Sequence, residues 1–266
     1  MVAQLRARPL REEQMPDKQQ KVLEYEAAGA SDQGRTRKSN EDAYGLDLRN
    51  DQGVCNFIVC DGMGGAAAGE IASRMAVEAM LHAMSDGVLT RETFQEAVDA
   101  ANHSVHHSAE QNPARAGMGT TLVAMATRGD RAWVAHVGDS RCYRMRDGGL
   151  ERLTHDHSLV DEQVRLGQLT PAQAETSPMR NVITRAVGTH ETVDVDVRIV
   201  DVRPGDAFLL CSDGLHGELD DDEIAGVLRE HPTPMDAVGQ LIDTANDKGS
   251  ADNVTAVLVQ LSALSG

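Results

Sequence analysis

Aromatic residues are scarce in this chain of 266 residues: they make up 3% of it, with one tryptophan, three tyrosines and three phenylalanines. The hydrophobic fraction is nevertheless 41% and the charged fraction 25%, which is typical of a folded protein and excludes a disordered chain. The core must therefore consist of valine, leucine, isoleucine, alanine and methionine side chains. The length fits one large domain or two small ones.

Positive charge is also in short supply. Lysine and arginine total 25 against 42 aspartates and glutamates, which leaves a formal net charge of -17. This excess argues against general nucleic-acid binding and against docking on anionic membranes. No apolar run approaches the roughly 20 residues of a membrane span, and the N-terminus lacks the apolar middle of a secretory signal. We therefore expect a cytoplasmic protein with no nucleic-acid or membrane partner.

The four cysteines show no C-x-x-C spacing, which argues against a zinc site or a disulfide framework. Cys55, Cys60 and Cys211 lie in or beside apolar runs, and the fourth is Cys142. Their surroundings predict buried free thiols.

The order of the predicted elements indicates the fold class. Residues 1–21 are interpreted as a flexible tail, and residues 22–264 as one domain. Alternating or apolar runs bounded by turn residues predict strands at 22–30, 42–48, 55–60, 120–127, 132–137, 141–145, 194–200, 207–211 and 254–261. Helical spacing predicts helices at 69–84, 90–111, 221–230 and 234–247. Residues 155–190 are interpreted as an inserted flap. Strands and helices are segregated along the chain, which favours an α+β fold of packed sheets with helices on their outer faces.

Acidic residues gather at the predicted strand ends. Asp61 and Asp213 each follow an apolar strand and precede a glycine, and Asp252 stands just before the last strand. Carboxylates on rigid strand ends suit hard cations such as Mg²⁺ and Mn²⁺, and the Gly62 carbonyl offers a further oxygen. A water held between two such ions is a strong nucleophile toward phosphorus. The alternative is that these aspartates are ordinary acidic turn residues.

Two further residues leave alternatives open. Asp139, within Gly138-Asp139-Ser140-Arg141, reads by itself as part of a hairpin or a bulge. Arg37 stands five residues before Asp42. It fits either a plain salt bridge or a clamp on phosphate oxygens, which the guanidinium fork matches well.

Taken together, these motifs resemble the metal-dependent Ser/Thr protein phosphatases of the PP2C (PPM) family, in their compact bacterial form. The segments that carry the resemblance stand in the family's order and span about 22–261. They are Gly34-x-x-Arg37-x-x-Asn40-Glu41-Asp42, Asp61-Gly62-Met63-Gly64-Gly65, Gly117-Met118-Gly119-Thr120-Thr121, Val137-Gly138-Asp139-Ser140-Arg141, Leu153-Thr154-x-Asp156-His157-Ser158, Asn181-Val182-Ile183-Thr184-Arg185-Ala186-Val187-Gly188, Ser212-Asp213-Gly214-Leu215 and Asp252-Asn253-Val254-Thr255.

The resemblance implies a four-layer αββα sandwich, with two central antiparallel sheets flanked by helices and a small flap at about 155–190. It implies two tightly bound Mn²⁺ or Mg²⁺ ions and a third, weaker one. The roles it implies are metal bridging for Asp61, a backbone oxygen ligand for Gly62, second-metal ligands for Asp213 and Asp252, a third metal site at Asp139, outer-shell contacts through water for Glu41 and Asp42, and phosphate binding for Arg37.

The implied activity is hydrolysis of phosphoserine and phosphothreonine by direct attack of a metal-bridging water. The implied partners are phosphorylated proteins and a cognate Ser/Thr kinase, and we expect a monomer. One departure concerns Ala66, where similar proteins commonly carry a histidine that is proposed to protonate the leaving group. This departure leaves open a catalytically weakened regulator that binds phosphoproteins. The sequence also leaves open a phosphatase of small phosphate esters that uses the same metal site.

Several histidines have other interpretations. His103, His106 and His107 have spacing that could hold a metal, but they fall opposite the apolar stripe of their helix and fit a solvated face better. His157 is interpreted as structural. His216 lies close behind Asp213 in sequence and is a weaker candidate for proton transfer.

Overall fold

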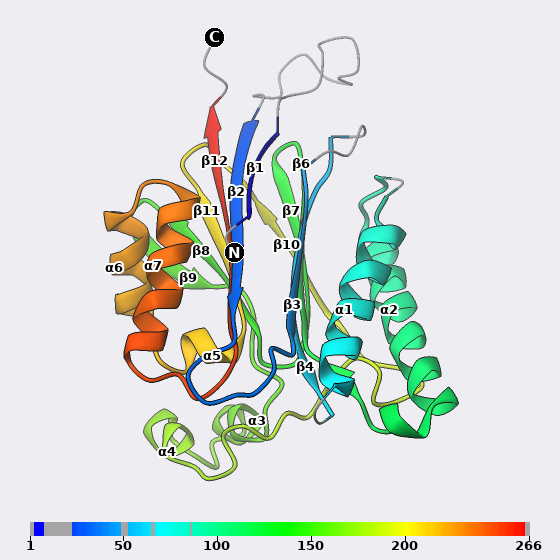
Figure 1. The fold of residues 1–266 in the computed structure, drawn as a ribbon. Coiled ribbons are helices and arrows are strands. Elements are labelled where there is room, and N and C mark those ends of the chain that lie inside the picture. Colours follow the sequence, from blue (N-terminus) through cyan, green and yellow to red (C-terminus); the bar gives the residue numbers. More distant parts are fainter. Residues whose placement is uncertain (1–2, 8–22, 49–52, 65–66, 86, 264–266) are drawn as a thin grey trace.

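The computed structural model describes residues 3–7, 23–48, 53–64, 67–85 and 87–263. Within these ranges no helix is both long and apolar enough to cross a membrane. Two sheets face each other at the centre, and helices cover both outer faces (Figure 1). The predicted α+β class and αββα layering are confirmed.

The first sheet has the strand order β1-β2-β12-β11-β8-β9, and all its pairings are antiparallel. Its strands are β1 (Ala3–Ala7), β2 (Leu23–Asp32), β8 (Arg141–Arg146), β9 (Gly149–Arg152), β11 (Ala207–Cys211) and β12 (Val254–Ala263). β2 and β12 pair over their whole length, so the two ends of the domain lie side by side.

The second sheet has the order β10-β7-β6-β4-β3, with the short strand β5 paired to β4. Its strands are β3 (Asp42–Asp47), β4 (Cys55–Met63), β5 (Gly119–Thr120), β6 (Leu122–Arg128), β7 (Arg131–Val137) and β10 (Asp196–Asp201). The pairs β3–β4 and β6–β7 join strands that follow each other in the chain, whereas β4–β6 and β7–β10 join strands that are separated by helices.

The helices form the two outer layers. α1 (Ala68–Ala83) and α2 (Arg91–Gln111) cover the second sheet, and the 3₁₀ turn η2 (Pro113–Arg115) follows them. α5 (Asp213–His216), α6 (Asp221–Glu230) and α7 (Pro234–Asp247) cover the first sheet. Both α2 and α6 begin with a capping box, in which Thr90 and Asp220 accept the backbone N–H three residues on.

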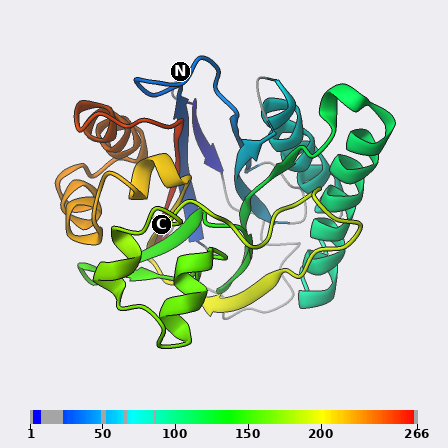
Figure 2. The same ribbon diagram turned by 90° about the horizontal axis from the view of Figure 1, so that it is seen from below.

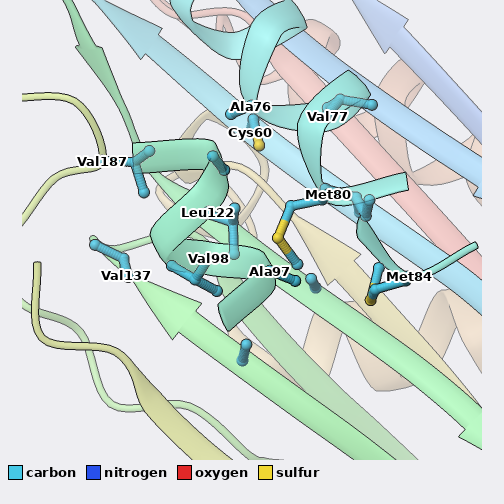
Figure 3. Close-up of a cluster of buried hydrophobic side chains, with 14 of the residues drawn as sticks. Cys60, Ala76, Val77, Met80, Met84, Ala97, Val98, Leu122, Val137 and Val187 are labelled. Carbon is cyan, nitrogen blue, oxygen red and sulfur yellow. The ribbon is translucent and has the colours of Figure 1, made fainter. Parts of the chain in front are cut away.

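Three apolar layers alternate with the two sheets. On β4, Phe57 and Val59 lie between the sheets, whereas Ile58 and Cys60 pack under α1 and α2. Figure 3 shows Cys60 beside Ala76 of α1 in this outer layer. This is the two-residue period of a strand that is covered on both faces. All four cysteines are free and buried, as predicted. Because of this alternation, the strand residues of the inner layer are the ones that face the opposite sheet, up to the end of the sandwich.

The flap lies at one end of the sandwich (Figures 1 and 2). It contains α3 (Leu159–Arg165) and α4 (Pro171–Glu175), which begin at the side-chain caps Ser158 and Thr170. Its return is fixed to β5, because Thr120 and Val187 exchange two backbone hydrogen bonds of 3.0 and 2.8 Å.

One part of the segment 1–21, which was predicted as a flexible tail, forms a strand in the structure. Ala3–Ala7, which lie within this segment, form the edge strand β1, which pairs with residues 25–29 of β2. The open edge of β2 supplies the unpaired backbone groups that such a strand can use. Residues 1–2 and 8–21 lie outside the described residues. The domain bounds of 22–264 stay a prediction.

The end of the flap depends on a glycine that packs against α2. Gly188 has φ +88°, and a Cβ there would lie 2.1 Å from Val105 Cγ1. We expect Gly188→Ala to lower the free energy of unfolding by about 2–4 kcal/mol, because backbone strain and overpacking add. The control is Gly148→Ala at φ +79°, where nothing lies within 4 Å, and strain alone should cost about 1 kcal/mol. Urea unfolding measures both, and equal losses would contradict the packing argument.

Candidate metal centre

The two sheets bring the predicted acidic residues to the same end of the sandwich. Asp42 in β3 and Asp61 in β4 are directly opposite each other in the antiparallel register. Asp213 begins α5, two residues after β11 ends, and Asp252 stands two residues before β12 begins. In Figure 1 this is the lower end, where α5 lies and which faces the flap. Residues from four parts of the sequence therefore converge.

The backbone of Asp61 is held by two threonines. Its N–H donates to the Thr121 hydroxyl at 2.9 Å, and its carbonyl accepts from the Thr121 N–H and the Thr120 hydroxyl, each at 2.8 Å. Burial, followed by the charges of Asp42 and Asp213, raises the pKa of Asp61 well above its ordinary value. The carboxylate is thus rigidly placed where its negative charge is poorly compensated.

A hydrogen bond between the two sheets fixes Asp42. The Ser212 hydroxyl, at the end of β11, donates to Asp42 Oδ2 at 2.7 Å. The side chain is buried and its Oδ1 atom has no hydrogen-bond partner. Burial, followed by the charges of Asp213 and Asp252, raises the pKa of Asp42 to about 7, although the hydroxyl contacts act in the opposite direction. A buried acceptor without a donor is what a metal-bound water would satisfy.

Asp213 and Asp139 complete the group of perturbed carboxyls. Asp213 Oδ1 is also buried without a partner. Burial and the charge of Asp252 raise the pKa of Asp213, and burial and the charge of Asp213 raise the pKa of Asp139 to about 8. Asp139 stands two residues before β8 and Asp213 two residues after β11, and these two strands pair at Arg141 and Cys211, so the charge of Asp213 acts on the predicted third-site residue.

His216 lies behind Asp139. Its Nε2 atom is 3.0 Å from the backbone oxygen of Asp139, and burial and the charge of Arg141 lower its pKa to about 3. A histidine with so low a pKa, bonded to the main chain, positions the Asp139 loop. This arrangement does not favour the proton-transfer role considered for it.

Two glycines make room for close backbone contacts at the site. The Gly62 N–H donates to the Glu41 carbonyl at 3.1 Å, and a Cβ on Gly62 would lie 2.1 Å from the Gly69 carbonyl oxygen. A Cβ on Gly69 would in turn lie 2.6 Å from Glu41 Oε2. Only glycine therefore fits at either position, and Glu41 lies directly beside the Gly62 backbone.

Arg37 contacts the cluster through Asp252. Its Nη2 atom donates to Asp252 Oδ2 at 2.6 Å, and this hydrogen bond is the main reason that the pKa of Arg37 is raised. The Arg37 side chain is half exposed, at 50%. The guanidinium therefore adds a positive charge at the rim of the cluster and still reaches solvent.

Ser212, Thr121 and Asn253 lie within the sequence motifs, but no role was predicted for them. Asn253 holds the loop that carries Arg37 and Glu41: its Oδ1 accepts from the Glu41 N–H at 2.8 Å, and its Nδ2 donates to the Gln33 and Ser39 carbonyls at 2.9 Å. The sequence signal that could have indicated this role is a polar residue, Asn253, at the end of an otherwise apolar strand.

The flap is tied to the same end by buried polar contacts. Arg141 donates to both carboxylate oxygens of Asp156, with Nη2 at 2.6 Å from Oδ2 and Nε at 3.0 Å from Oδ1. The buried His157 accepts from the Gly138 N–H at 3.1 Å and bonds Asp196 through its other nitrogen at 3.3 Å. These contacts agree with the structural role predicted for His157.

The donor set fits hard divalent cations, although no three acidic, histidine or cysteine side chains in the described part of the chain already stand in a metal-holding group. Like charges repel in a buried site, and Asp252 is bonded to Arg37. The unpartnered Oδ1 atoms of Asp42 and Asp213 and the raised carboxyl pKa values indicate a need for positive charge. Oxygen donors alone suit Mg²⁺ and Mn²⁺.

Ala66, where similar proteins commonly carry a histidine, lies outside the described residues.

Comparison with known proteins agrees with this arrangement. The family described as Protein phosphatase 2C matches residues 30–259. The chain is 38% identical over 242 residues to the serine/threonine protein phosphatase PstP of Mycobacterium tuberculosis; the match covers 90% of this chain but 45% of PstP, so the chain spans less than half of that relative. It is 36% identical over 236 residues to the serine/threonine phosphatase stp of Listeria monocytogenes, covering 86% of this chain and 93% of that protein.

A solved structure has the same fold. The catalytic domain of the serine/threonine protein phosphatase PstP, in complex with two manganese ions, superimposes with a TM-score of 0.80 at 35% identity, covering 90% of this chain and 99% of that one. The family match covers most of the chain and includes each of its acidic strand ends. The chain belongs to the protein phosphatase 2C family.

Proposed function

We propose that this chain is a Mn²⁺- or Mg²⁺-dependent phosphatase that hydrolyses phosphoserine and phosphothreonine in proteins. The observation that carries the proposal is the convergence of Asp42, Asp61, Asp213 and Asp252 at one end of the sandwich, with buried oxygens that lack hydrogen-bond donors. Family membership and the manganese bound by PstP support the same reaction and the same cofactor.

In this proposal Asp61, the Gly62 carbonyl, Asp213 and Asp252 hold two cations, and Asp139 with Asp213 holds a weaker third. Bound there, paired dications would supply a water acidic enough to attack phosphorus and would stabilise the charge on the transferring group.

The chain's own groups orient the reaction. Thr120 and Thr121 hold the Asp61 backbone, and Ser212 holds Asp42, so these carboxylates have little freedom to move during the reaction. Arg37 reaches solvent from the rim and would bind the phosphate of the substrate with its fork of N–H donors. Glu41 and Asp42 would act through water as outer-shell partners.

The proposed substrates are phosphorylated proteins, and the proposed partner is the Ser/Thr kinase that phosphorylates them. The names of the relatives support this choice of substrate class over small phosphate esters. The cytoplasm is the proposed location, with the chain acting as a monomer.

The metal site is tested by Asp61→Asn, which keeps the side-chain shape but removes its charge. We expect release of phosphate from a phosphothreonine peptide with Mn²⁺ to fall by about 100-fold or more, because the site loses the carboxylate that both ions would share. The control, Asp130→Asn, changes an exposed turn residue and should keep the rate. Metal-independent turnover, or an active Asp61→Asn enzyme, would overturn the proposed mechanism.

Arg37→Ala tests phosphate binding. We expect KM for the phosphothreonine peptide to rise by about tenfold, because a charge-assisted pair of hydrogen bonds is lost. The matched control is Arg35→Ala, which alters an exposed arginine of the same loop that bonds the Asn246 carbonyl instead. If the two variants have the same KM, Arg37 does not bind the substrate.

The metal-free protein should also show a pH dependence of stability. A carboxyl whose pKa is raised by folding, as at Asp139 from 3.8 to about 8, stabilises the fold below its unfolded pKa and loses that contribution as pH rises through the folded value. In EDTA, Asp139→Asn should therefore gain stability relative to the natural chain by about 2–4 kcal/mol between about pH 5 and about pH 8. Urea unfolding at both pH values measures this, and a difference that does not change with pH would contradict the raised pKa.

A further inference from the structure

A polar pocket lies on the outer layer that α1 and α2 form. Its lining contains none of the acidic residues of the candidate metal centre. It has a volume of about 420 Å³ and is formed by the C-terminal half of α2, the η2 turn and Met75 of α1. His103 and His107 lie one helical turn apart on its wall, with ring centroids 5.7 Å apart and ring planes within 9° of parallel. Two of the three histidines that were predicted to lie on a solvated helix face thus line a concave site.

The lining of this pocket differs in charge from the chain as a whole. The chain carries a net charge of -17, yet none of the described residues that line the pocket is an aspartate or a glutamate. The permanent charge on the wall is the guanidinium of Arg115, and the other polar groups include the hydroxyls of Ser104 and Ser108. Such a wall favours an anion and disfavours a metal cation.

Arg115 is held in place for this role. Its Nη1 atom donates to the Ser108 hydroxyl at 2.8 Å, and the side chain is partly buried. This contact uses one of the five N–H donors of the guanidinium, so the others remain for a ligand. Nε2 of His107 already bonds the Gln111 side-chain nitrogen at 2.7 Å. A fixed guanidinium beside hydroxyl groups and the His103 imidazole matches the three acceptor oxygens of a phosphoryl group.

Backbone and packing contacts connect the pocket with the strand that carries Asp61. The Arg115 carbonyl accepts from the Met118 N–H at 3.1 Å, and Met118 is fully buried. Gly64, in the loop that follows Asp61, packs on Met118 so closely that a Cβ there would lie 2.8 Å from Met118 Cα. A ligand bound to Arg115 would therefore contact the segment that ends at Met118, and this segment packs on Gly64, three residues after Asp61.

We propose that this pocket, formed by Arg115, His103, His107 and Ser108, binds a phosphoryl group at a site separate from the metal centre. The group belongs either to free phosphate or to a second phosphorylated residue of a protein. The proposal depends on the pocket's own chemistry and stands whether or not the chain is a phosphatase.

The test uses histidine-labelled protein in EDTA, so that no hydrolysis occurs, and follows the ring signals of His103 and His107 by NMR during titration with inorganic phosphate. We expect saturable shifts of both signals that chloride at equal ionic strength does not reproduce. Arg115→Gln should weaken binding by about tenfold, and Arg115→Lys should weaken it less because the charge stays. The control is Arg91→Gln, an exposed position at the start of the same helix, which should leave the titration unchanged.

A second arm of the same titration uses a phosphoserine peptide and distinguishes the two sources of the phosphoryl group. Tighter binding than that of inorganic phosphate assigns the site to phosphoproteins, and equal binding assigns it to the free anion. Signals that do not move with phosphate in the natural chain, or that move equally in the folded Arg115→Gln variant, would overturn the proposal. After removal of EDTA, a shift of both signals by Zn²⁺ together with no shift by phosphate would also overturn the proposal, since the two histidines would then form a cation site.

Discussion

Repulsion between buried carboxylates is the constraint on which the functional end of this protein depends. Asp42, Asp61 and Asp213 are brought together although burial raises the pKa of each one, and the charges of neighbouring carboxylates raise it further. Left to themselves, these groups would separate or bind protons. The sandwich holds them in place, and Arg37 compensates part of the charge at the rim. The remaining deficit of positive charge is what makes the site suitable for dications.

The two sheets supply the rigidity that this crowding requires. Inner-face residues of β4 and β11, such as Phe57 and Phe208, are fully buried between the sheets. The same alternation carries Asp61 and Ser212 onto the inner side at the strand ends, where Ser212 reaches across to Asp42. Because these positions follow from strands buried on both faces, moving one carboxylate would mean displacing a packed strand.

Local patterns in the sequence predicted the long elements well. The segments 55–60 and 207–211 are apolar runs, the segment 90–111 has helical periodicity, and the structure has β4, β11 and α2 there. The elements that the sequence did not reveal are β1, β5, β9 and α5. They are short, and their formation depends on tertiary partners, as when β5 pairs with β4 at Gly62 and Met63.

The acidic members of the site could be predicted because aspartates beside glycines interrupt apolar strands. Their partners could not be predicted in the same way. Arg37 meets Asp252 across 215 positions of sequence, and Asn253 meets Glu41 across 212, so no local period indicates either contact.

The central claim is the convergence of the carboxylates on paired cations. Anomalous scattering from crystals grown with Mn²⁺ tests it most directly: we predict two ions that share Asp61, with Asp213 and Asp252 on the second, and manganese absent from these carboxylates or bound elsewhere on the surface would contradict it.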